Sequence, residues 1–106
     1  MKRTNEKIER ILTAIGEEFS VDPIELLSPK QGSKDVSTAR QVAALMLRNT
    51  LNIADTGALL GRRNSAYAYG AINAITKRAD RDYDFFMKVL KLCSRFSVRW
   101  KELVTE

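Results

Sequence analysis

Residues 52–75, "NIADTGALLGRRNSAYAYGAINAI", hold two sets of helix signals separated by a short polar turn. Asn52 is a residue type that caps helices, and Asp55 follows three positions later, so a short helix is expected to begin here. Gly61 is placed to end that helix in a left-handed conformation, and Asn64 is placed to cap the next one. Two helices joined by three or four residues are the pattern of a helix-turn-helix.

The second of these helices is expected to have one apolar and one more polar face. The apolar face recurs at helical spacing and consists of Ala68, Ala71, Ile72 and Ile75. The residues expected to point outward are Ser65, Ala66, Tyr69, Gly70 and Asn73. Gly57, Ala68 and Ala71 are small enough to let the two helix backbones approach closely.

Helical periodicity also dominates the rest of the chain. A first helix is predicted over residues 4–19, and a short second one follows Asp22 as its cap, with Pro23 in the first helical position. The polar stretch that follows, residues 28–37, is expected to be an exposed basic loop, so the third helix should begin near Ser37 or Thr38. A last helix is predicted over residues 83–104. The fold class is therefore all-α, a compact bundle of about five to six helices with a helix-turn-helix.

With 106 residues, the chain is expected to form a single domain over 1–106, with its core at about 7–97 and a helical extension at 98–106. No apolar run approaches the ~20 residues of a membrane span, and no apolar stretch follows the basic start, which favours a cytoplasmic protein. Cys93 is the one cysteine and lies in an apolar helical pattern, which predicts a buried core residue. No metal site and no cofactor are expected.

Positive charge is concentrated in the middle of the chain. The formal net charge is +5, and residues 30–78 carry eight basic and two acidic side chains, whereas residues 1–29 carry four and six. Such a concentration is typical of a surface that binds a polyanion, although a solvated charged face has the same composition.

The order of elements resembles the C-terminal DNA-binding domain (domain IV) of the bacterial replication initiator DnaA, and more broadly the tryptophan-repressor-like fold. The resemblance covers about residues 7–97. The family's Val-Ala-Arg-Pro-Arg-Gln is similar to "VSTARQ" at residues 36–41, where Arg40 and Gln41 match. Its Gly-Gly-Arg-Asp-His-Thr-Thr-Val is similar to "GRRNSAYA" at residues 61–68, where Gly61 and Arg63 match. The resemblance implies double-stranded DNA as the partner.

Two departures from the family stand beside this resemblance. The Asp, His and Thr that contact bases in the family are absent here. The chain also lacks the G-x-x-x-x-G-K-[ST] loop of a nucleotide-binding module, so it does not contain the ATPase part of an initiator.

DNA binding through this fold assigns three sets of residues. Phosphate contacts are expected from Arg40, Gln41, Arg48, Arg62 and Arg63. Lys30 and Lys34, in the basic loop, are expected to reach an adjacent minor groove. Residues expected near base edges are Asn64, Ser65, Ala66 and Tyr67, with Asn73 further along the helix.

Other interpretations remain open at this point. Asn64 is more often only a helix cap, and Tyr67 and Tyr69 are alternatively packing residues under the neighbouring loop or the last helix. An enzyme is not expected, because the chain has no histidine and no clustered acidic residues for acid–base chemistry. The main alternative function is a helical protein–protein interaction module that keeps the fold without specific DNA recognition. Trp100, Leu103 and Val104 are expected to pack on the first helix, and a protein partner or homodimer contact through them belongs to this alternative.

Overall fold

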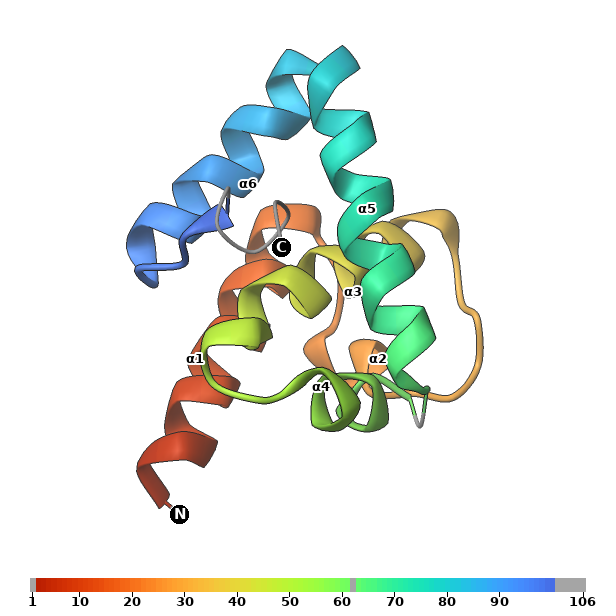
Figure 1. Cartoon of the computed structure of the whole chain (residues 1–106), viewed down its shortest axis with the longest axis vertical. Coiled ribbons are helices and arrows are strands. Elements are labelled where there is room, and N and C mark those ends of the chain that lie inside the picture. The colour runs from red at the N-terminus through yellow and green to blue at the C-terminus, as the bar shows by residue number, and fades with distance from the viewer. Residues whose placement is uncertain (1, 62, 101–106) are drawn as a thin grey trace.

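The computed structural model describes residues 2–61 and 63–100 (Figure 1). These residues contain six α-helices, one short 3₁₀-helix and no strand. The expectation of an all-α bundle of about five to six helices is confirmed. The elements are α1 (Lys2–Phe19), α2 (Pro23–Leu26), α3 (Lys34–Met46), η1 (Leu47–Asn49), α4 (Ile53–Leu59), α5 (Ser65–Arg81) and α6 (Tyr83–Arg95).

The central helix of the bundle is α3, which contacts α1, α2, α5 and α6. Its second half is fully buried from Val42 to Met46, and Ala43 and Ala44 in that stretch are small. On α5, Ala68 and Ala71 are small and buried as well. Small residues on both sides allow close packing of the two helices, and α3 and α5 share the most extensive contact between any two elements.

The third helix begins earlier than its sequence pattern predicts. It starts at Lys34 rather than near Ser37 or Thr38, because the Ser33 hydroxyl caps it by accepting a hydrogen bond from the Val36 amide at 3.2 Å. Lys34 and Asp35 in its first turn are exposed, so the apolar period begins only at Val36. The basic loop is therefore shorter than expected.

The last helix ends at Arg95, so the prediction of one continuous helix over residues 83–104 is wrong at residues 96–99, and residues 101–104 lie outside the described residues. Ser97 adopts a left-handed conformation with φ of 57°, and the Val98 amide donates to the Cys93 carbonyl at 2.8 Å. This is the Schellman ending of a helix, and it turns the Val98 side chain into the core.

The end of α1 is built in the same way and from the same tripeptide, Phe-Ser-Val. Ser20 also has φ of 57°, and the Val21 amide donates to the Gly16 carbonyl at 2.9 Å. In both places a buried valine after the serine accompanies the turn, which explains why a serine occupies a position that glycine favours.

Trp100 packs across α5 and α6 rather than on α1. Its ring stacks on Phe86 with 5.7 Å between ring centroids, and its Nε1 donates to the Thr76 hydroxyl at 3.3 Å. Leu103 and Val104, the other residues expected to pack here, lie outside the described residues. No helix in the described part of the chain has the length and apolar character needed to cross a membrane.

The Cys93 thiol is buried, as predicted, and lies 3.8 Å from the Met46 sulfur. Burial raises the pKa of this thiol to about 11, because the thiolate is poorly solvated there. A raised pKa stabilises the fold at pH values below the ordinary thiol pKa, and this stability is lost as the pH rises toward 11.

We therefore expect Cys93 to react with a disulfide reagent at pH 8 far more slowly in the native protein than in urea. Urea denaturation should show a stability that declines between about pH 9 and pH 11, and less so in Cys93→Ala at the same pH values. Equal reaction rates in the native and unfolded protein would contradict this.

Candidate nucleic-acid interface

Helices α4 and α5 form the helix-turn-helix that the sequence predicts (Figure 1). The Asn52 side chain accepts a hydrogen bond from the Asp55 amide at 2.8 Å, and the Asn64 side chain accepts one from the Tyr67 amide at 3.0 Å. Both caps are where they were expected. Gly61 has φ of 87°, in the left-handed region that was also expected.

Gly57 lies at the point where α4 meets the start of α5. A Cβ at this position would collide with the backbone carbonyl oxygens of Arg63 and Asn64. The Arg63 amide also donates to the Gly57 carbonyl at 2.7 Å, which holds the two segments together. The close crossing of the two helices therefore requires glycine here.

Arg63 stabilises this turn through hydrogen bonds from its guanidinium group. Its Nη1 donates to the Leu60 carbonyl at 2.6 Å, which satisfies a carbonyl at the C-terminus of α4. The same nitrogen donates to the Ser28 carbonyl at 3.2 Å, which joins the turn to the segment after α2. The guanidinium also lies over the Tyr67 ring, 5.1 Å from its centroid. Arg63 is half-buried, so only part of its charge faces solvent.

Arg40 is not on the surface, which corrects its expected role as a phosphate contact. Only 2% of the residue is exposed, and all three guanidinium nitrogens donate to backbone carbonyls. The acceptors are Leu26 at 3.1 Å, Gln31 at 3.1 Å and Glu25 at 2.6 Å. Arg40 lies four residues after buried Val36 on the inner face of α3, and from there it caps the C-terminus of α2.

The electrostatics of this cluster follow from burial. Desolvation lowers the pKa of Arg40, and the nearby positive charge of Arg63 lowers it further. Desolvation also raises the pKa of Tyr67, which keeps its hydroxyl neutral, while the two arginines oppose that shift. The turn therefore rests on two cations whose main partners are backbone carbonyls, and these add positive potential at the start of α5.

The two lysines of the basic loop are both exposed. Lys30 follows two residues after Ser28, whose carbonyl accepts a hydrogen bond from Arg63 in the turn. Lys34 lies in the first turn of α3. One helical turn further on, the Thr38 hydroxyl accepts a hydrogen bond from Arg78 near the end of α5. Each lysine is therefore close in sequence to a residue that contacts the turn or α5.

The other expected phosphate contacts are not shown to join this cluster. Arg48 is half-buried in η1, and the adjacent Asn49 donates to the Ser97 carbonyl after α6. Gln41 is half-buried on α3. Arg62 lies outside the described residues.

Of the four residues expected at base edges, two are engaged within the turn. Asn64 is the cap of α5, and Tyr67 is half-buried beneath Arg63. Ser65 is half-buried, whereas Ala66 is exposed. The start of the helix therefore offers a smaller contact surface than its sequence indicates.

The outward face of α5 continues well beyond these four residues. Its exposed members recur at helical spacing: Ala66, Tyr69, Gly70, Asn73 and Lys77. Tyr69 is 56% exposed, so it lies at the surface and is not a packing residue. We call this set the α5 outer face. Lys77 was not predicted as a contact. It lies on the same side of α5 as Ala66 and Asn73, so helical spacing in the sequence could have identified it.

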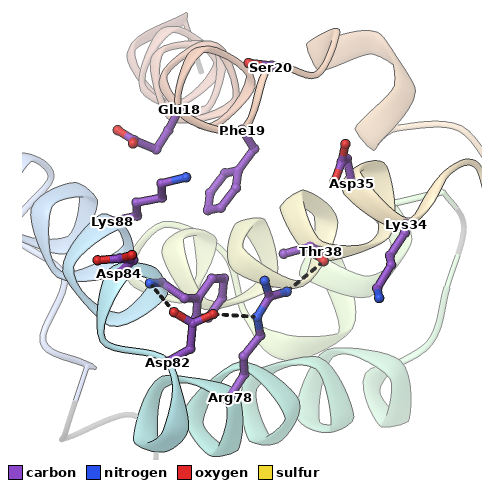
Figure 2. A pocket seen from close by; sticks show the side chains of 11 residues that line it. Glu18, Phe19, Ser20, Lys34, Asp35, Thr38, Arg78, Asp82, Asp84 and Lys88 are labelled. Carbon is purple, nitrogen blue, oxygen red and sulfur yellow. Dashed lines mark hydrogen bonds and ion pairs between the residues drawn. The ribbon is translucent and has the colours of Figure 1, made fainter.

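An open cleft of about 440 Å³ lies where α1, α3, α5 and α6 meet. Figure 2 shows Arg78 directed at Thr38 and Asp82, to which it is joined at 3.2 Å and 3.8 Å. Its charged lining residues are Glu18, Lys34, Asp35, Arg78, Asp82, Asp84 and Lys88. Because four carboxylates oppose three cations, the cleft is not suited to an anion.

Within the described residues, no three His, Cys, Asp or Glu side chains are grouped so that they could hold a metal ion. A comparison with protein-family models and with curated proteins finds no match for this chain.

Proposed function

We propose that this protein binds double-stranded DNA, with α5 in the major groove and α4 across the backbone. The observation that carries the proposal is the α5 outer face, an exposed and largely uncharged helix surface beginning at a helix-turn-helix. Second helices of such motifs dock in this way, with their N-terminal residues at the base edges. The resemblance to the DnaA C-terminal domain supports a role in replication, in its regulation or in transcription control.

The charges around α5 support the same partner. Lys77 lies on the α5 outer face, and Arg63 lies at the start of the helix. Lys30 and Lys34 are exposed close in sequence to Ser28 and Thr38, which contact the turn and the end of α5. Phosphates of the two strands that border a major groove lie on both sides of a helix placed in it. The proposed activity is binding, without catalysis.

A salt titration tests this proposal. We expect fluorescence anisotropy with a random duplex to give an affinity that falls steeply as salt rises, because each phosphate contact releases counterions. In Lys30→Ala/Lys77→Ala, affinity at low salt should fall, and the slope of log affinity against log salt should become less negative by about 2.

The matched control is Lys7→Ala/Arg10→Ala, which removes two exposed positive charges from α1. It should change the slope far less. Equal effects of the two double variants would show a general charge effect and contradict the assignment to α5. If the wild-type protein does not bind at low salt, the DNA proposal fails.

In that outcome, the alternative of a protein-binding module becomes the better proposal. One feature favours it: Tyr83, Met87 and Leu90 are large apolar side chains exposed on α6. They recur at helical spacing along one face of that helix.

A further inference from the structure

Two residues on the α5 outer face, Gly70 and Asn73, are poor helix formers, and no contact within the described structure requires either of them. A Cβ added to Gly70 would meet nothing within 4 Å, so no packing contact requires a glycine. Asn73 is exposed in the middle of the helix, where asparagine is unfavourable because its side chain competes with the backbone. Departures from local preference of this kind mark functional positions.

Asn73 also differs from the other asparagines whose side chains the structure describes. Asn52 and Asn64 accept capping hydrogen bonds from backbone amides, and Asn49 donates to the Ser97 carbonyl. Among the described residues, none forms a hydrogen bond with the Asn73 side chain. Its amide oxygen and nitrogen are both free, on a surface that faces outward.

We infer that Asn73 is the residue of α5 that selects a base, and that it selects adenine; this inference rests on the proposed DNA binding. A free carboxamide pairs with adenine in the major groove by accepting from N6 and donating to N7. Asn64 is less suited to this pairing, because its oxygen already accepts from the Tyr67 amide.

The spacing along α5 fits this placement. With a rise of ~1.5 Å per residue, Ala66 and Asn73 lie about 10 Å apart along the helix, within the ~12 Å width of a major groove. Gly70 lies between them, and because it has no side chain, the helix backbone can approach base edges closely there. Lys77, one turn beyond Asn73, is then placed for a phosphate, and the first carboxylate of α5 occurs only at Asp80.

Selection of binding sites from a randomised duplex library tests the inference. Wild-type protein should enrich a site with an A·T pair at one position that Asn73→Ala no longer distinguishes. Affinity of Asn73→Ala for the selected site should fall about 5- to 150-fold, the range of one bidentate base contact. Affinity for random duplex should stay the same. Alanine is the better helix former, so circular dichroism should show an intact fold.

Lys77→Ala is the matched comparison on the same face. It should weaken binding to all sequences alike and leave the selected site unchanged. A library that yields no preferred site, or an Asn73→Ala variant that keeps the wild-type preference at every position, overturns the inference while the proposed function stands. Absence of any duplex binding by the wild-type protein at low salt overturns both.

Discussion

Replacing Arg40 with alanine is expected to lower the free energy of unfolding by about 3 kcal/mol or more. The substitution removes the Arg40 donors from the carbonyls of Leu26, Gln31 and Glu25 and opens a cavity beside α2. The bond to Leu26 is buried and the other two are part-buried, while the Glu25 carbonyl keeps a hydrogen bond from the Ser28 amide at 3.3 Å. Each unsatisfied buried group costs about 1–3 kcal/mol. Because small domains have only about 5–15 kcal/mol in total, the loss is large.

Urea denaturation followed by circular dichroism measures this effect. Arg40→Lys should be intermediate, since it keeps the charge but cannot direct three donors at three separate carbonyls. Lys77→Ala, an exposed substitution on α5, should stay within about 0.5 kcal/mol of the wild type. A loss below 1 kcal/mol in Arg40→Ala would contradict the structural role of this arginine.

The Arg40 prediction bears on any test of DNA binding. Arg40 holds the segment after α2 in place, and Arg63 attaches the helix-turn-helix to the same segment at Ser28. An Arg40→Ala variant that loses DNA affinity would therefore report disturbance of the turn and not a missing phosphate contact. Exposed lysines are the informative positions for that question.

The second large effect is expected from alanine at two helical glycines, with opposite signs. Gly57→Ala should destabilise the protein by about 3 kcal/mol, because its Cβ would meet rigid backbone at the turn. Gly70→Ala should stabilise it by up to about 1 kcal/mol, because its Cβ points into open space and alanine favours the helix.

The pair forms its own control, since the chemical change is identical. Thermal or urea unfolding of the two variants measures both values on one scale. Destabilisation by Gly70→Ala would show that the glycine has a role within the fold, and a neutral Gly57→Ala would show that α4 and the turn are less closely packed than described. Under the proposed function, Gly70→Ala should also weaken DNA binding while raising stability.

Much of the local structure could be predicted because its causes lie within a few residues. Asn52 and Asn64 cap helices through amides three positions ahead, and Gly61 adopts the positive φ that its position demands. The apolar face of α5 follows directly from helical spacing. The start of α3 and the end of α6 were misplaced because their local signals are weak. The first turn of α3 before Val36 is exposed, and the left-handed position that ends α6 is Ser97 where glycine is more common.

The candidate site was predicted less well, because exposure of an arginine depends on distant partners. Both arginines were expected to contact phosphates, Arg40 from the resemblance to the family's Arg-Gln pair and Arg63 from its charge and its place in the turn. Their acceptors are carbonyls up to 15 and 35 residues away along the chain, which no local pattern indicates. Lys77, by contrast, could have been identified by continuing the outward face of the helix.

By itself, therefore, the sequence determined the helical class, the caps and the helix-turn-helix, since these follow from hydrogen bonds and periodicity within a turn or two of helix. The tertiary structure was needed to show which cationic side chains donate hydrogen bonds to backbone carbonyls and which remain at the surface. The physical reason is that a side chain's surroundings are set by the elements that pack on it, and those come from other parts of the chain.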